Sequence, residues 1–262
     1  MFAYLPTPVV IYLTVVMGLL GLVMGSALNC LALRLAKGEK WGGSTRSACP
    51  ACGHVLSARE LIPLFSWLCQ KGKCRHCGSP VSPRYPITEA LLAALYMALL
   101  HRFGLSVSLV SHLIFASSLF TLSLVDLDTQ IIPDRFILIP IVTRFVEVLF
   151  TSGIRSFLPT ALPGLIVAGA VLALSLIMDK VLGKDTMGGG DIKLLFVIGL
   201  YLTIPQCLLM VLLACVIGIA FASILMKIDP ETPFPFGPAL SVAAIITLFI
   251  GNPLITWYLS LF

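Results

Sequence analysis

The sequence predicts an all-α polytopic membrane protein with about eight transmembrane helices and a small zinc-binding cytoplasmic loop domain. Three observations lead to this prediction. Of the 262 residues, 58% are hydrophobic and only 11% are charged, whereas a soluble domain is nearer a quarter charged. The apolar residues gather in long uncharged windows, and roughly 20 apolar residues are enough to cross a bilayer. Two C-x-x-C pairs follow the first of these windows.

The uncharged windows define most of the spans, at residues 1–33, 90–101, 103–125, 156–178, 194–226 and 238–262. One helix over 194–226 would be roughly 50 Å long at 1.5 Å per residue, which exceeds the roughly 30 Å hydrocarbon core, so we divide it at Pro205. A further span requires Arg144 and Glu147 to pair at i and i+3. We therefore expect helices over 8–33, 87–101, 105–125, 136–150, 157–178, 192–204, 205–226 and 238–261.

Positive charge concentrates between the first two predicted helices. Residues 34–86 hold nine of the 17 basic residues, against only Glu39 and Glu60. The positive-inside rule then places this loop in the cytoplasm. This distribution accounts for the formal charge of +5, so we expect the lipid bilayer as a partner and no nucleic acid.

The cytoplasmic loop carries Cys49-Pro-Ala-Cys52-Gly53 and Cys74-Arg-His-Cys77-Gly78. The spacing C-x2-C-x21-C-x2-C is one residue longer than the usual zinc range of roughly 15–20. Two thiolates three positions apart can hold one ion from a tight turn, and two such knuckles complete a closed, structural four-cysteine zinc site. We interpret His54, Cys69 and His76 as non-ligands, with His76 as the first substitute.

Two aspartates stand where a predicted helix meets water. Asp126 follows the 103–125 window, and Asp191 follows three glycines and precedes the 194–226 window. An ionisable residue at the membrane indicates a functional site. The predicted topology puts both at the cytoplasmic side, where they can meet and share a proton as paired carboxylates do in aspartic proteases.

The residues alone leave several alternatives open. Membrane carboxylates also serve transporters and proton relays. Asp128, Asp134 and Asp185 could each replace one member of the pair, although Asp134 is expected to N-cap the helix that follows it. The run 188–190 could in principle cradle a phosphate, but no Lys-Ser or Lys-Thr pair follows it.

Six motifs in order resemble the type IV prepilin peptidases over essentially the whole chain. One is the pair of cysteine knuckles. The others read Gly25-Ser-Ala-Leu-Asn29 with Arg34-Leu35, Arg84-Tyr-Pro-Ile-Thr-Glu89, Asp126-x7-Asp134, Gly188-Gly-Gly-Asp191 and Pro235-Phe-Gly-Pro238. The chain departs from the family pattern at Ala27, where a bulkier Phe is common, and at the extra thiol of Cys69.

The resemblance implies a bifunctional enzyme of the bacterial inner (cytoplasmic) membrane whose active site faces the cytoplasm. It would cleave the short basic leader of type IV prepilins or pseudopilins and methylate the new N-terminal amine with S-adenosylmethionine. It assigns catalysis to Asp126 and Asp191, and zinc binding to Cys49, Cys52, Cys74 and Cys77. A peptidase without methyl transfer, or a non-catalytic pilus or secretion assembly factor, is the alternative, and a homo-oligomer stays open.

The methyl-donor site is harder to place, because no G-x-G-x-x-G follows a predicted strand. We expect its lining at the inner ends of the first two helices, from Gly25, Asn29, Arg34 and Glu89, although Glu89 also suits a capping position near a helix start. The resulting division of the chain is a first transmembrane helix over 1–33, a zinc-knuckle domain with a methyltransferase role over 34–86, and a transmembrane aspartic peptidase domain over 87–262.

Overall fold

The protein is almost entirely helical in the residues that its structure, a computed structural model, describes: 6–39, 46–183, 186–228 and 235–261. Within these residues, regular structure consists of helices and two isolated β-bridges. The all-α prediction is therefore confirmed. The chain divides into two compact units, Met1–Leu109 and Val110–Phe262.

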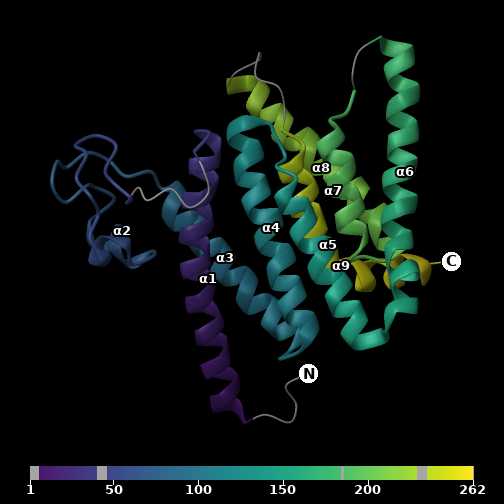
Figure 1. Cartoon of the computed structure of the whole chain (residues 1–262), viewed down its shortest axis with the longest axis horizontal. Coiled ribbons are helices and arrows are strands. Elements are labelled where there is room, and N and C mark those ends of the chain that lie inside the picture. The colour runs from purple at the N-terminus through teal and green to yellow at the C-terminus, as the bar shows by residue number, and fades with distance from the viewer. Residues whose placement is uncertain (1–5, 40–45, 184–185, 229–234, 262) are drawn as a thin grey trace. The chain divides into compact units, whose positions relative to one another are not determined.

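The first unit is built on a close pair of helices, α1 (Thr7–Ala36) and α3 (Arg84–Phe103), which pack along each other (Figure 1). A Cβ added at Gly21 would lie 2.6 Å from the Cα of Ala93, and one at Gly25 would lie 2.8 Å from the Cα of Glu89. Only glycine permits this approach of the two backbones. These glycines therefore form the face of α1 that packs against α3.

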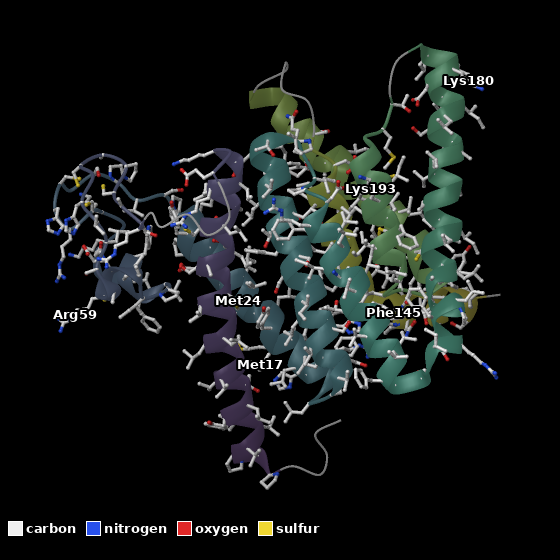
Figure 2. The ribbon with its side chains drawn as sticks, in the orientation of Figure 1. Met17, Met24, Arg59, Phe145, Lys180 and Lys193 are labelled. Carbon is white, nitrogen blue, oxygen red and sulfur yellow. The ribbon has the colours of Figure 1, made fainter. Side chains whose placement is uncertain are left out.

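The cysteine loop of the first unit contains a one-turn 3-10 helix, η1 (Ala58–Leu61), and a short helix, α2 (Phe65–Cys69). Its two β-bridges join Ala48 to Val55 and Lys73 to Pro80. Each bridge closes the base of one C-x-x-C turn. Figure 2 labels Arg59 in this loop.

The second unit is a helical bundle with α7 near its centre, in contact with α5, α6, α8 and α9 (Figure 1). Several of its helices end at Gly, which readily adopts the backbone conformation that terminates a helix. Others start near Pro, which has no N–H to leave unpaired in the first turn. The elements are α4 (Val107–Thr129), whose first residues belong to the first unit, α5 (Arg135–Ser152), η2 (Ile154–Ser156), α6 (Phe157–Leu182), α7 (Gly189–Gly199), α8 (Ile204–Ile228) and α9 (Gly237–Leu259).

All eight predicted helical segments are present, but the number of membrane crossings is not settled at eight. Among the described residues, five helices are long and apolar enough to cross a membrane. They cover Thr7–Ala36, Val107–Thr129, Ile154–Leu182, Ile204–Ile224 and Gly237–Leu259. The 11 residues of α7 extend over about 16 Å, roughly half of the hydrocarbon core. The protein is thus a multi-pass membrane protein, and eight crossings stay a prediction.

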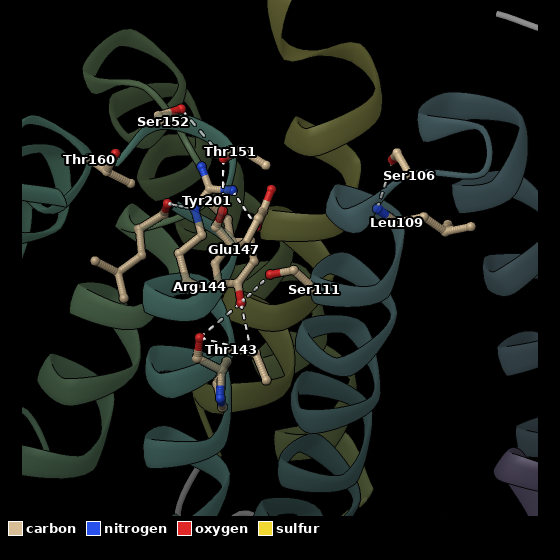
Figure 3. Close-up of polar contacts among 12 residues, drawn as sticks. Ser106, Leu109, Ser111, Thr143, Arg144, Glu147, Thr151, Ser152, Thr160 and Tyr201 are labelled. Carbon is tan, nitrogen blue, oxygen red and sulfur yellow. Dashed lines mark hydrogen bonds and ion pairs between the residues drawn. The ribbon is translucent and has the colours of Figure 1, made fainter. Parts of the chain in front are cut away.

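A polar network joins α5 to the end of α7 inside the second unit (Figure 3). Arg144 Nη1 lies 2.7 Å from Glu147 Oε2, which confirms the predicted i, i+3 pair. Arg144 Nε donates to the Leu200 carbonyl oxygen at 2.9 Å. The hydroxyl of Tyr201 lies 3.2 Å from Ser111 Oγ. Arg144 therefore caps a carbonyl at the C-terminal end of the short helix α7.

Candidate functional site

Asp126 lies in the last turn of α4, which continues past it to Thr129. The predicted end of this helix at 125 is thus four residues early. The side chain of Asp126 is buried, and the residue is only 4% exposed. The backbone N–H of Gly237 donates to Asp126 Oδ2 at 3.0 Å, from the first residue of α9. Because backbone N–H groups at a helix N-terminus carry partial positive charge, this contact offsets part of the cost that burial adds to ionising the carboxylate.

Asp191 lies in the first turn of α7, directly after the glycine run. Its N–H donates to the carbonyl oxygen of Gly188 at 3.1 Å. Burial, with a smaller contribution from the charge of Asp126, raises the pKa of Asp191 to about 6. The two carboxylates thus lie in one unit and close enough to interact electrostatically. A pair of this kind can keep one proton between two acids up to about pH 6.

The three rival carboxylates have other surroundings. Asp128 is exposed on the last turn of α4. Asp134 occupies the N-cap position of α5 but makes no capping hydrogen bond; instead its Oδ1 lies 2.7 Å from Lys193 Nζ. The predicted N-cap position of Asp134 is confirmed. Its side chain, however, bonds a cation on α7 and not a backbone N–H of α5, because the cation offers it a charge-assisted bond. Asp185 lies outside the described residues.

Two residues near the carboxylates were missed by the sequence-based assignment. Gly237 is one, since a Cβ there would stand 2.7 Å from Asp126 Oδ2 and would displace the carboxylate. Its signal was present in the Phe-Gly-Pro run before the last helix. Lys193, labelled in Figure 2, is the other. A lysine two positions after Asp191 gives no pattern that points to Asp134, so no sequence signal identifies this pair.

The four predicted zinc ligands form one group, in which the sulfur atoms of Cys49, Cys52, Cys74 and Cys77 all lie within 4.8 Å of one another. The two turns are built alike. In the first, the N–H of Cys49 donates to the carbonyl of His54 at 2.9 Å, and the N–H of Gly53 donates to the carbonyl of Cys49 at 2.9 Å. Gly53 and Gly78 have φ values of 71° and 72°, which glycine adopts without strain.

The four-thiol group fits a tetrahedral metal ion. The sulfurs of Cys49 and Cys77 are 3.9 Å apart, and two sulfurs bound at about 2.3 Å to one zinc ion stand roughly 3.8 Å apart. Backbone N–H groups of Cys52 and Ala51 lower the pKa of Cys49 to about 6, and the Ser79 hydroxyl and N–H lower the pKa of Cys77.

Cys52 has the opposite preference. Although the backbone N–H of His54 lowers the pKa of Cys52, burial and the neighbouring thiols raise it to about 11. Without a cation, the group therefore resists becoming four thiolates at once. A divalent ion removes this repulsion, which is the electrostatic reason why a cluster of this kind holds metal.

The predicted methyl-donor residues occupy one end of the α1–α3 pair, in different roles. Gly25 serves the backbone contact with Glu89. Asn29, one turn further along the same face of α1, is fully buried, and neither its amide nitrogen nor its amide oxygen has a hydrogen-bond partner among the described residues. Arg34 is half-buried in the last turn of α1. A buried amide without partners is costly, so Asn29 has the properties of a ligand-binding group.

Glu89 does not cap its helix. Helix α3 begins at Arg84, one turn earlier than predicted, so Glu89 falls beyond the first turn. It is 5% exposed, and its Oε2 accepts a hydrogen bond from the backbone N–H of Leu64 at 2.6 Å. Leu64 has a φ of 63°, a costly conformation for a residue with a side chain. Glu89 thus fixes a strained turn of the cysteine loop on α3.

Two known family models match the chain. The model of the bacterial Peptidase A24 N-terminal domain matches residues 19–103, and the model of the type IV leader peptidase family matches residues 113–223. The first match covers the C-terminal part of α1, the cysteine loop and α3. The second covers α5 and α7 with most of α4 and α8, so it includes both Asp126 and Asp191.

Curated relatives match over most of the chain, and several are named prepilin leader peptidase/N-methyltransferase. The one from Bacillus subtilis (strain 168) is 33% identical over 82% of this chain and 86% of its own length. Those from Stutzerimonas stutzeri and Burkholderia pseudomallei (strain 1026b) are 31% and 33% identical, over 92% and 96% of this chain and 92% and 89% of their own lengths. No solved structure matches. The chain belongs to the type IV leader peptidase family.

Proposed function

We propose that this protein is a membrane aspartic endopeptidase that removes the short basic leader from type IV prepilins or pseudopilins, and that it then methylates the new N-terminal amine. The observation that carries the first half is the carboxylate pair, in which burial and the charge of Asp126 raise the pKa of Asp191 to about 6. The names of the relatives support both halves.

The surroundings of the two acids suggest how they divide the work. Asp126, which accepts the Gly237 N–H, is the ionised member and takes a proton from the attacking water. Asp191 is the protonated member and gives its proton to the departing amine as the peptide C–N bond breaks. The water oxygen forms the new bond to the carbonyl carbon, so the reaction consumes one water and the dyad ends with the same number of protons.

The position of the dyad suits a substrate that is itself anchored in the bilayer. Asp126 lies in the last turn of a membrane-spanning helix, and Asp191 lies in the first turn of α7. A pilin precursor with an apolar helix in the bilayer would present its leader junction at this interface. The basic residues of 34–86 favour a cytoplasmic location for this face by the positive-inside rule, which corresponds to the bacterial inner membrane.

The second half of the proposal rests on Asn29. S-adenosylmethionine would supply a methyl group on a positively charged sulfur, which moves to the amine nitrogen as that nitrogen loses a proton. The orphaned amide of Asn29 would bind the methyl donor, with Arg34 nearby in sequence and Gly25 and Glu89 shaping the helix pair behind it. Zn²⁺ held by Cys49, Cys52, Cys74 and Cys77 would be structural and would keep the loop folded.

The functional division that follows is 1–33 as the first transmembrane helix, 34–86 as the zinc-knuckle domain and 87–262 as the peptidase domain. Mass spectrometry of a prepilin co-expressed with this protein tests the proposal. With the wild type, the prepilin should lose its leader mass and gain the mass of one methyl group. With Asp191→Asn it should stay uncut, because the acid is gone. Asp128→Asn, which changes an exposed carboxyl on the same helix as Asp126, is the matched control and should cleave normally.

Other outcomes separate the alternatives. Leader loss without the added methyl group would leave a peptidase alone. Full cleavage by Asp191→Asn would contradict the dyad. A prepilin left uncut by the wild type would contradict leader cleavage for that substrate and would favour a non-catalytic assembly role.

A further inference from the structure

A second cluster of metal-binding side chains lies in the cysteine loop, beside the four thiols. One ligand atom from each of His54, Glu60 and His76 lies within 4.8 Å of the other two. The two imidazole rings have centroids 3.4 Å apart with an interplanar angle of 30°. His54 directly follows the first knuckle and His76 lies inside the second, so the fold that gathers the four thiols also brings these two rings together.

Glu60 is held in place from its own helix. Its Oε2 accepts hydrogen bonds from the Ser57 N–H at 2.9 Å and the Ser57 hydroxyl at 2.7 Å, which forms a capping box at the start of η1. The side chain of Glu60 is only 5% exposed. Its carboxylate is therefore fixed in one orientation, facing the imidazoles, with Oε2 at 3.7 Å from His54 Nε2.

The other oxygen of this carboxylate has no partner. Glu60 Oε1 is buried and accepts no hydrogen bond within the described part of the chain. An unpaired buried carboxylate oxygen costs several times more than a typical hydrogen bond gains. The 3.7 Å separation from His54 is too long for a direct hydrogen bond, so the imidazole does not offset this cost. A cation bound among the three side chains would offset this cost.

We propose that His54, Glu60 and His76 form a second divalent-metal site, distinct from the four-thiol group, which takes an ion such as Zn²⁺ or Co²⁺. Two imidazoles and one carboxylate are a donor set that zinc accepts with one coordination position left open to water. Three atoms bound to one ion at about 2 Å stand roughly 3–4 Å apart. The observed separations, all within 4.8 Å, lie close to that range.

The chemistry of the two sites predicts different binding. Four thiolates form a closed site, whereas two imidazoles, a carboxylate and a water form an open one. The second ion should therefore bind more weakly and exchange with solvent more readily. It would tie η1 to both knuckles, since its ligands come from all three segments of the loop.

Cobalt titration of the full-length protein in detergent tests the proposal. After removal of bound metal, Co²⁺ is added stepwise and followed by absorption, and bound metal is counted by mass spectrometry after free ion is removed. Thiolate-bound Co²⁺ gives intense sulfur-to-metal charge-transfer absorption, which imidazole and carboxylate ligands do not give. We expect two ions per chain, the first with charge transfer and the second without it.

The variants His54→Ala, His76→Ala and Glu60→Gln should each keep the first ion and lose the second. His101→Ala removes an exposed histidine on α3, outside the cysteine loop, and should keep both. The charge-transfer absorption shows in each variant whether the loop is folded. If His76→Ala lost both ions, Glu60→Gln would decide whether the second site is separate, because this variant leaves both knuckle sequences intact.

Three results would overturn the proposal. The wild type could saturate at one thiolate-bound ion. The three variants could bind as many ions as the wild type. All three variants could lose both ions together, which would mean a single shared centre. Failure of the four-thiol site has a different signature, namely no charge transfer while the second signal persists.

Discussion

Asp126 and Asp191 are the same residue type, yet their surroundings differ in a way that assigns them different roles. Both are shielded from water, but Asp126 receives a backbone N–H from the start of α9, and a helix N-terminus offsets part of the cost of a buried negative charge. Asp191 is shielded from water and exposed to the charge of its partner, and both effects favour its protonated form. The dyad that we propose is therefore asymmetric before any substrate binds.

This asymmetry predicts the pH dependence of cleavage. A raised pKa means that Asp191 keeps its proton at pH values where a free Asp has already lost it, and gives it up as the pH rises through about 6. We expect kcat/KM for leader cleavage to fall above that pH, by about tenfold per pH unit, because the acid form disappears. A pH–rate profile with a purified prepilin measures this directly.

Methyl transfer to a leader-free pilin serves as the control, since it does not use the dyad. Its rate should not show the same alkaline decline. A cleavage rate that stays constant from pH 6 to pH 8 would contradict the assignment of Asp191 as the acid.

At the scale of one element, α7 depends on a neighbouring helix for a hydrogen-bond donor at its C-terminal end. The helix has 11 residues and ends among neighbouring helices, where its last carbonyl groups need donors. Arg144 of α5 supplies one to Leu200 and is itself neutralised by the buried Glu147. The contact fixes the far end of the helix whose first turn carries Asp191.

Replacement of Arg144 should destabilise the protein strongly. Arg144→Met leaves the carboxylate of Glu147 buried without its cation, a change that typically costs about 3 kcal/mol. Thermal unfolding in detergent should show a clearly lowered Tm. The double variant Arg144→Met/Glu147→Gln should recover much of the loss, because it removes the uncompensated charge.

Arg155→Met is the matched control for this experiment. Arg155 is exposed in η2, so its loss should leave the Tm close to that of the wild type. If the double variant were as unstable as Arg144→Met alone, the pairing with Glu147 would not be the source of the stability.

At the scale of the whole molecule, the two proposed activities belong to different compact units. Asn29 and the cysteine loop lie in Met1–Leu109, and both aspartates lie in Val110–Phe262. The boundary between the two family models, which match 19–103 and 113–223, falls close to the boundary of the units. Variants in the first unit should therefore separate the two activities.

Asn29→Leu tests the separation of the two activities most directly. It removes an amide that has no hydrogen-bond partner among the residues that the structure describes, so the Tm should stay the same or rise by the equivalent of about 1 kcal/mol. Methyl transfer should be lost while leader cleavage continues, which mass spectrometry of the pilin product reads as a leader-free chain without the added methyl group.

Thr247→Val is the control, since Thr247 Oγ1 is also buried without a partner but belongs to α9. It should affect neither product mass. Loss of both activities in Asn29→Leu would indicate a packing role for Asn29, and full methylation would exclude it from the methyl-donor site.

Much of the architecture could be read from the pattern of apolar residues. The eight predicted helical segments all exist, the Arg144–Glu147 pair forms, and the four cysteines meet in one group. These features depend on local spacing, which sequence displays. Asp134 occupies the predicted N-cap position, but its side chain bonds Lys193 and not the backbone of its own helix. The capping position expected for Glu89 was wrong, because α3 begins earlier and the carboxylate bonds the backbone of Leu64.

The sequence by itself determined which segments become helices, which cysteines share a turn, and which aspartates stand at helix ends, since hydrophobic periodicity and short-range geometry set all of these. Only the tertiary structure decided which groups surround them. The Gly237 N–H on Asp126, the raised pKa of Asp191, the orphaned amide of Asn29 and the cluster of His54 with Glu60 and His76 arise where elements far apart in the chain pack together. The free energy of such contacts depends on burial and direction in space, and neither is a property of local sequence.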